Sequence, residues 1–438
     1  MSLIGVRNFS SSSLRAAAPT RGKAQGFAKK VSGAKTTGKK VSAGSLYKPW
    51  QQTIATSNLN KNAFPVEVPT FKPSEISQCV DQVMSFSNAH YKYLYTLGSF
   101  KQNQFNELFP RPISMVRRNT TQKLFELLKN SPDRKFILTG ESGIGKSVLL
   151  SQVHSLAFEE NALVINISYP ELFLNGTNDF FYDGASYVQP MYLKRLLNKI
   201  LKANNKNLLS SIPISGNYKF ANADPKDSAS RKFVQITGGK STLLDLISVK
   251  TSPRNRGDLF QAVIQELSKQ AKVPVVFTVD NFSRITSEPK SAYKNSNNEN
   301  IHVLELQLGK TIMEIVSGKV LFPHKLSAVV LATSGCDRTN RTLPVGLQKQ
   351  PHDPYVSRKH YDHDLACLLS KGNVREFPVN KLSKQELQNL LEFYYKAEII
   401  LSKDNNEKTI EQLVDEKYLL SGNGNPRELL KSLVLQFS

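Results

Sequence analysis

The stretch GESGIGKS, residues 140–147, decides the fold of this chain. It matches the pattern G-x-x-x-x-G-K-[ST], follows the apolar segment FILT at 136–139 and opens an apolar segment that continues to about residue 158. A strand, a glycine-rich loop and a helix in this order make backbone N–H groups converge on a phosphate, and the helix N-terminus adds partial positive charge. The alternative is a glycine turn that binds nothing. We therefore expect a phosphate-binding loop made of Gly140, Glu141, Ser142, Gly143, Ile144, Gly145, Lys146 and Ser147.

Lys146, Ser147 and Asp280 have the main roles in the expected nucleotide site. Lys146 should reach the β- and γ-phosphates, and the hydroxyl of Ser147 should bind Mg²⁺. A second magnesium ligand belongs at the end of another buried strand, and VVFTVD at 275–280 supplies Asp280 there. The next residue, Asn281, stands where related ATPases usually carry a glutamate that activates the attacking water.

That asparagine predicts slow hydrolysis or none. An amide cannot accept a proton, and general-base catalysis contributes about 10²–10⁴ in rate. The site should therefore hold a nucleotide far better than it converts it. Glu141 in the loop is the alternative base.

The rest of the chain alternates strands with helices. Apolar runs at 163–167 and 326–332 alternate with helical patterns near 120–130, 191–202, 258–270 and 301–317. The helix near 120 should be capped by Thr120 or Thr121. Such alternation predicts an α/β fold, a P-loop NTPase with a parallel sheet and flanking helices. Residues 203–232 should form an insertion or long loop, and residues 335–375 look irregular.

Two polar residues outside the loop are further candidates for phosphate contact. Ser334 follows the strand at 326–332 and should lie near the γ-phosphate; the alternative is a core strand that ends in a turn. Arg427, in the sequence GNGNPREL, opens the last helix of a helical C-terminal lid and should reach the phosphates; the alternative is a surface arginine at a helix start. His360 and His363 are spaced for a metal, but their irregular, charged surroundings favour a solvated loop.

The charge of the chain predicts a polyanionic partner. The net charge is +22 over 438 residues, and residues 1–66 hold eleven Lys and Arg but no acid. Residues 1–20 are typical of a mitochondrial transit peptide, with cleavage after Phe9, rather than an ordinary basic tail. Residues 21–62 form an expected disordered basic arm, residues 63–376 the core with an N-terminal extension, and residues 377–438 the lid. No apolar run is long enough to span a membrane.

In combination, these features resemble one family. The acid-free leader, Met115-Val116-Arg117 before the first helix, the loop, VVFTVDN and the ending GNPREL are similar to the death-associated protein three family, the GTP-binding proteins of the mitochondrial ribosomal small subunit. The resemblance spans about residues 110–438. It implies an AAA+-like core in the mitochondrial matrix, in the head of the small subunit. The implied partners are small-subunit rRNA, other small-subunit proteins and the large subunit through a bridge.

The resemblance also implies the cofactors, GTP or GDP with Mg²⁺. The N-K-x-D element that reads guanine in ordinary GTPases is not visible, so ATP remains the alternative nucleotide. By analogy with related folds, Met115, Val116 and Arg117 should lie beside the base. The competing function is a mitochondrial AAA+-type ATPase acting on nucleic acid or protein. Asn281 and the lack of a recognisable arginine finger count against it.

Overall fold

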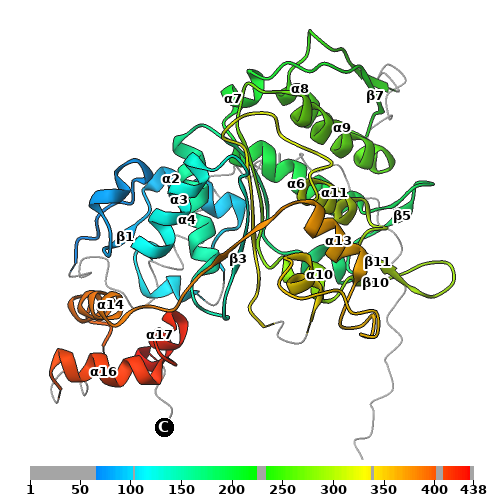
Figure 1. Cartoon of the computed structure of the whole chain (residues 1–438). Coiled ribbons are helices and arrows are strands. Elements are labelled where there is room, and N and C mark those ends of the chain that lie inside the picture. Colours follow the sequence, from blue (N-terminus) through cyan, green and yellow to red (C-terminus); the bar gives the residue numbers. More distant parts are fainter. Residues whose placement is uncertain (1–65, 102–103, 224–232, 337–339, 401–407, 435–438) are drawn as a thin grey trace, which may run out of the picture. The chain divides into compact units, whose positions relative to one another are not determined.

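A five-stranded parallel sheet forms the centre of the computed structural model, which describes residues 66–101, 104–223, 233–336, 340–400 and 408–434 (Figure 1). The strand order is β13-β3-β12-β9-β4, and every neighbouring pair is parallel. The strands are β3 (Lys135–Thr139), β4 (Leu163–Ile167), β9 (Val275–Val279), β12 (Ala328–Ala332) and β13 (Arg375–Pro378). Because β3 lies between β12 and the edge strand β13, the loop that follows it opens at the carboxyl edge of the sheet, one strand in from its end. The predicted P-loop NTPase fold is confirmed.

Four of these strands were readable from their sequences. β4, β9 and β12 are buried along their whole length, and β3 is buried at its centre, because helices cover both faces of the sheet. β13 was not recognisable from its own residues. Only Phe377 of this strand is buried, its neighbours are partly or fully exposed, and Pro378 is tolerated because the strand lies at the sheet edge. The strand also extends past the boundary expected at 376.

Helices cover the two faces of the sheet (Figure 1). On one side lie α2 (Asn88–Leu97), α3 (Lys123–Asn130) and α4 (Lys146–Glu159). On the other side lie α6 (Pro190–Ala203), α9 (Arg256–Lys269), α11 (Gln307–Val316) and α13 (His363–Lys371), with α8 (Leu243–Ser248) next to α6 and α9. In the described part of the chain, no helix combines the length and the apolar character needed to cross a membrane.

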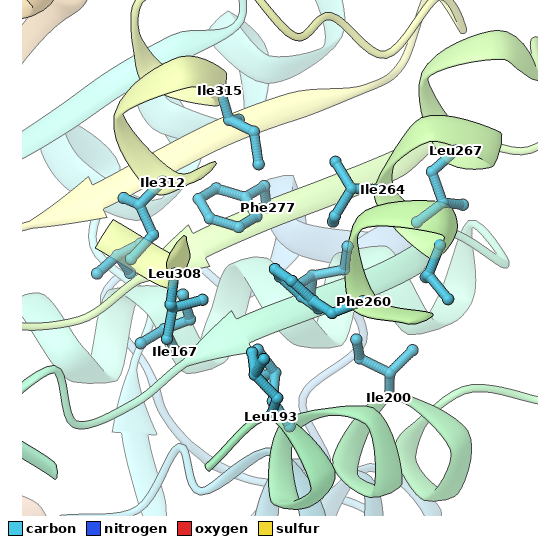
Figure 2. Packing of buried hydrophobic residues seen from close by; sticks show 14 of the residues in the cluster. Ile167, Leu193, Ile200, Phe260, Ile264, Leu267, Phe277, Leu308, Ile312 and Ile315 are labelled. Carbon is cyan, nitrogen blue, oxygen red and sulfur yellow. The ribbon is translucent and has the colours of Figure 1, made fainter. Parts of the chain in front are cut away.

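The main core lies between the sheet and α6, α9 and α11 (Figure 2). Helical spacing places Phe260, Ile264 and Leu267 on one face of α9, where they pack toward Phe277 of β9. α6 and α11 contribute Leu193, Ile200, Leu308, Ile312 and Ile315 to the same cluster. Burying one side chain of this size stabilises the fold by about 1.5–3 kcal/mol. This packing fixes the strands whose ends carry the site.

The stretch 335–375, expected to be irregular, contains two helices, so that expectation was wrong. They are α12 (Thr342–Gly346) and α13, which begins after Asp362, whose carboxylate accepts a hydrogen bond from the N–H of Leu365. The exposed His363 and Asp364 at the start of α13 hid its buried positions Leu365 and Leu369. Among the residues that the structure describes, no group of three His, Cys, Asp or Glu side chains could hold a metal ion.

The expected helix cap near residue 120 was also wrong. Arg118–Gln122 form a turn of π-helix (η4), and α3 begins only at Lys123 without a side-chain cap. Thr121 is buried instead, and its hydroxyl donates to Oε1 of Gln152 in α4 at 2.9 Å. The turn therefore ties the entry of α3 to the helix of the phosphate loop.

Several short helices and antiparallel strand pairs lie outside the central sheet. The insertion near 203–232 contains α7 (Lys206–Ser210) and β7 (Tyr218–Ala221), which pairs with β8 (Phe233–Ile236). Two further antiparallel pairs are β5 (Phe181–Tyr182) with β6 (Tyr187–Val188), and β10 (Lys290–Lys294) with β11 (Asn300–His302). Short helices are α5 (Glu171–Leu174), α10 (Ser283–Ser287), η1 (Pro73–Gln78), η3 (Asn106–Leu108) and η5 (Pro253–Asn255).

The C-terminal lid packs on the N-terminal extension. The lid helices are α14 (Lys384–Lys396), α16 (Ile410–Leu420) and α17 (Pro426–Val434). β1 (Val83–Ser85) and β2 (Ile113–Met115) pair antiparallel beside α14. The ring of Phe109 lies 6.1 Å from those of Phe393 and Tyr394, inside a shared hydrophobic cluster. The lid is therefore held against the N-terminal part of the described chain. The transit peptide and basic arm expected at 1–62 lie outside the described residues.

Candidate nucleotide site

The phosphate loop connects β3 to α4, and two glycines, Gly143 in the loop and Gly335 after β12, allow close contacts around it. Gly143 has a φ of +88°, and a Cβ there would lie 2.8 Å from Oδ1 of Asn425 in the lid. Gly335, at the end of β12, has a φ of +81°, and a Cβ there would lie 2.3 Å from the carbonyl oxygen of Gly140. Side chains at these positions would push away the lid or the neighbouring strand. Glycine thus allows the loop, the lid and β12 to meet.

Lys146 is buried at the start of α4. Its ammonium donates to the carbonyl oxygens of Gly140 at 2.9 Å and Glu141 at 2.6 Å. Burial lowers the pKa of Lys146 to about 8, and the nearby positive charge of Arg427 acts in the same direction while Asp280 opposes it. A phosphate in the loop would offer charged acceptors to the same ammonium, which favours its protonated form.

Nucleotide affinity should therefore fall above pH 8. The bound phosphates raise the pKa of Lys146, so binding takes up a proton once the free protein has lost it. Affinity should be constant below pH 8 and should decrease about tenfold per pH unit above it. Titration with a fluorescent nucleotide between pH 7 and 9.5 measures this. Lys146→Arg keeps its charge over the whole range, so its weaker affinity should not change with pH. A constant wild-type affinity up to pH 9.5 would contradict the assignment of Lys146.

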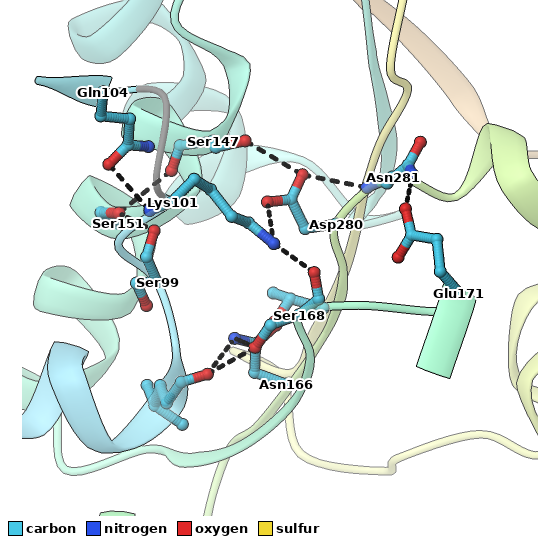
Figure 3. A network of polar contacts seen from close by, with 12 residues as sticks. Ser99, Lys101, Gln104, Ser147, Ser151, Asn166, Ser168, Glu171, Asp280 and Asn281 are labelled. Atoms are coloured by element: carbon cyan, nitrogen blue, oxygen red, sulfur yellow. Dashed lines mark hydrogen bonds and ion pairs between the residues drawn. The ribbon is translucent and has the colours of Figure 1, made fainter. Parts of the chain in front are cut away.

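Ser147 and Asp280 meet at the same edge of the sheet, as predicted (Figure 3). The Ser147 hydroxyl donates to Oδ1 of Asp280 at 3.1 Å, because α4 begins beside the carboxyl end of β9. A hydroxyl and a carboxylate oxygen at this separation are the hard oxygen ligands that Mg²⁺ prefers. These two residues therefore fit a magnesium ion next to the phosphate loop.

Lys101 is a residue of this site that sequence reasoning missed. Its ammonium lies 3.1 Å from Oδ2 of Asp280, donates to the carbonyl oxygen of Ser168, and sits 3.5 Å from the centre of the Tyr169 ring. Lys101 belongs to the N-terminal extension, far from every motif in the sequence. No local pattern could have placed its positive charge on the predicted metal ligand.

Asn281 connects three parts of the site. It adopts a φ of +57°, and its Nδ2 donates to Oε1 of Glu171 on α5 (Figure 3). On its other side, Oδ1 accepts from the Ser283 hydroxyl at 3.2 Å, and Ser283 Oγ lies 3.0 Å from Ser334 Oγ. Glu171 was not predicted, although a residue just after β4 lies at the carboxyl edge of the sheet, where ligands of such folds bind.

Arg117 lies at the far end of the site, and its guanidinium is hydrogen-bonded to the lid segment. Its guanidinium donates to both carboxylate oxygens of Glu386 in α14, at 2.9 and 3.0 Å. It also donates to the carbonyl oxygens of Asn380 and Lys381, both at 2.8 Å. Arg117 and Glu386 are almost completely buried. The arginine therefore holds the lid against the segment before α3.

The lid reaches the loop through Asn425 and Arg427. Asn425 Nδ2 donates to the carbonyl oxygen of Ser142 at 2.9 Å, and its Oδ1 caps α17 by accepting from the N–H of Arg427 at 3.1 Å. The same N–H of Arg427 lies 3.3 Å from the carbonyl oxygen of Gly143, and its Nε donates to Glu428 at 3.2 Å. Asn425 therefore both caps the last helix and joins the lid to the loop.

One cavity of about 580 Å³ unites most of the predicted residues. Its volume is that of a small-molecule site. The predicted residues that line it are Ser142, Gly143, Ile144, Gly145, Lys146, Ser147, Met115, Arg117, Asp280, Ser334 and Arg427. Three others do not line it. Val116 is wholly buried, Gly140 contributes its carbonyl to Lys146, and Glu141 is half exposed and paired with Lys381 at 2.9 Å.

The other end of the cavity is apolar. It is formed between the N-terminal extension and the lid by Phe105, Phe109, Ile113, Leu382, Leu390 and Tyr394. One cavity thus combines the glycine-rich loop with an apolar end, the two kinds of surroundings that a nucleotide requires.

Comparison with known proteins gives one family. A family model described as mitochondrial ribosomal death-associated protein 3 matches residues 114–432. No curated protein matches the sequence. Among solved structures, the crystal structure of Cdc6p from Pyrobaculum aerophilum matches with a TM-score of 0.30 and 13% identity, over 73% of this chain and 67% of that chain. The fold assignment rests on the strand order and the phosphate loop.

Proposed function

The chain belongs to the mitochondrial ribosomal death-associated protein 3 family, and we propose that it binds a guanine nucleotide with Mg²⁺ as a structural ligand. The family places it in the mitochondrial small ribosomal subunit. The observation that carries the proposal is the cavity itself, because loop, N-terminal extension and lid all contribute to its lining. A nucleotide there would join these parts and fix one shape for the neighbours in the subunit.

The residues have separate roles in this proposal. Lys146 and the N–H groups of the loop bind the phosphates, and Arg427 faces them from the lid. Ser147 and Asp280 hold Mg²⁺, which supplies charge neutralisation at the phosphates. The nucleobase occupies the apolar end of the cavity beside Met115. The family favours GTP or GDP, with ATP as the alternative.

Nucleotide hydrolysis should be slow because Asn281 stands where related ATPases carry a glutamate that acts as general base. A rate far below the ordinary enzyme value of about 10 s⁻¹ is expected. The proposed setting is the head of the small subunit, with contacts to its rRNA and proteins and a bridge to the large subunit.

The competing function is an AAA+-type ATPase that acts on nucleic acid or protein. Sedimentation of tagged protein from mitochondrial lysate, with nucleotide extracted from the purified protein, separates the two. Co-migration with small-subunit rRNA and one retained guanine nucleotide supports the structural role. A free ring-shaped oligomer that hydrolyses nucleotide rapidly supports the motor and contradicts the proposal.

Residues 21–45 should strengthen RNA binding through charge alone. This segment holds seven Lys and Arg and no acid, and each phosphate contact releases counterions. Deleting it should weaken binding to small-subunit rRNA, most strongly at low salt, and should leave nucleotide affinity unchanged. Filter binding at several salt concentrations measures this. Changing the seven residues to glutamine keeps the length and should have the same effect. Equal salt dependence of both variants and the wild type would refute an electrostatic role.

Residues before Ser10 should be removed on import into mitochondria. Their Arg, Ser and Ala content without acids is typical of a transit peptide. N-terminal sequencing of the protein from mitochondria should find a start near Ser10. An intact Met1 or Ser2 would rule out a cleaved presequence.

A further inference from the structure

We propose that Glu171 is the general base of a slow nucleotide hydrolysis in this site, oriented by Asn281. The inference rests on the nucleotide binding proposed above. Glu171 begins α5, four positions after β4 ends at Ile167. Because β4 pairs in parallel with β9, the segments that follow the two strands lie side by side (Figure 3). A carboxylate from one strand end thus stands next to the amide at the other.

One oxygen of Glu171 is anchored and the other is not. Oε1 accepts from Nδ2 of Asn281, whereas Oε2 is buried without a hydrogen-bond partner among the described residues. Glu171 lines the same cavity as Lys146 and Ser147. An unpartnered carboxylate oxygen at the loop end of this cavity is a place where a water molecule binds and where its proton can be accepted.

Asn281 is itself held in the orientation that this requires. Its Oδ1 accepts from the Ser283 hydroxyl, which is in turn in hydrogen-bond contact with Ser334 at the end of β12. The amide therefore presents its N–H group, and not its oxygen, to Glu171. The positive φ of Asn281 turns the chain at this point, and asparagine tolerates that conformation better than most residues.

The other nearby carboxylates are engaged elsewhere. Of the described residues that line the cavity, only Asp280 and Glu171 carry carboxylates. Asp280 accepts from Ser147 and pairs with Lys101. Glu141, the alternative base in the sequence, lies outside the cavity lining and pairs with Lys381. Glu171 is thus the carboxylate with a free oxygen at the site.

The reaction is an in-line hydrolysis. The oxygen of a water molecule attacks the γ-phosphorus and forms a P–O bond while Oε2 of Glu171 accepts the water's proton. The bond between the γ-phosphorus and the β–γ bridging oxygen breaks, which yields nucleoside diphosphate and inorganic phosphate. The lysine of the loop stays against the phosphates throughout. A nucleoside triphosphate bound in assembly would end as a retained diphosphate.

Single-turnover hydrolysis tests the proposal on the mature full-length chain. Protein is loaded with γ-labelled GTP, or with ATP in a parallel series, plus Mg²⁺, and phosphate release and nucleotide affinity are measured separately. Glu171→Gln should slow release about 10²-fold and should change affinity less than twofold. Glu126→Gln, on the exposed side of α3, is the matched control and should match the wild type.

The pH profile distinguishes a base from a merely structural residue. The wild-type rate should depend on pH, because a general base must be deprotonated to accept the proton of water, whereas the rate of Glu171→Gln should not depend on pH. Asn281→Ala removes the donor to Oε1 of Glu171, so hydrolysis should slow while nucleotide affinity stays unchanged. Asn281 is a positioning residue and its loss should slow hydrolysis less than loss of Glu171.

Three outcomes overturn the proposal. The first is a Glu171→Gln protein that releases phosphate at the wild-type rate. The second is a loss of rate in Glu141→Gln and not in Glu171→Gln. The third is wild-type protein that binds GTP without any release above the buffer rate, which leaves the structural role intact. Failure of all variants to bind nucleotide would instead contradict the proposed function.

Discussion

Lys146→Ala is expected to empty the nucleotide site and to lower both thermal stability and incorporation into the small subunit. Its ammonium is the buried cation at the base of the loop, and alanine offers the phosphates no partner. A ligand at a hundredfold excess over its Kd stabilises the folded state by about 2.7 kcal/mol, which the variant would lose. Nucleotide extraction, thermal unfolding and the amount of protein in gradient-purified small subunits measure the three effects.

A surface lysine provides the control for this variant. Lys319→Ala breaks an exposed ion pair with Glu314 and should change none of the three readouts. Arg427→Ala should resemble Lys146→Ala in kind, and the double variant should be less than additive because both residues act through one ligand. Normally assembled, translating ribosomes that carry Lys146→Ala with an empty site would show that the nucleotide is dispensable.

Arg117→Met is expected to destabilise the protein by about 3 kcal/mol. The side chains of Arg117 and Glu386 are only 10% and 11% exposed, and the arginine makes four hydrogen bonds to the lid segment. Methionine fills much of the volume but leaves the Glu386 carboxylate buried without its partner. Urea denaturation should show the loss, and limited proteolysis should cut the lid faster than in the wild type.

Removing the charges of both Arg117 and Glu386 separates the contribution of the ion pair to stability from the contribution of side-chain packing. Arg117→Met with Glu386→Leu should lose less stability than Arg117→Met alone, because no uncompensated buried charge remains. Lys384→Met breaks an exposed pair with Asp415 and should leave the free energy of unfolding close to that of the wild type. If Arg117→Met were as mild as Lys384→Met, Arg117 would not be the residue that fastens the lid.

The sequence by itself determined the features that neighbouring residues encode. The phosphate loop is a local pattern, and four sheet strands were recognisable because burial on both faces selects uninterrupted apolar residues. The same reasoning placed Ser147 with Asp280, since parallel strands end at one edge. It failed for β13, an edge strand with one buried side, and for α13, whose polar face masked its apolar positions.

Only the tertiary structure decided which distant residues complete the site. Three contacts join residues that are far apart in the sequence. Lys101 pairs with Asp280, 179 positions away, and Glu171 accepts a hydrogen bond from Asn281, 110 positions away. Arg117 pairs with Glu386, 269 positions away. Arg117 was expected beside the nucleobase, yet its guanidinium donates its hydrogen bonds to the lid segment. Such pairs leave no periodic trace along the chain, because their distance is set by how helices and strands pack and not by the residues next to them. The chemistry of the loop can therefore be predicted from the sequence, whereas the residues that surround the loop are known only from the tertiary structure.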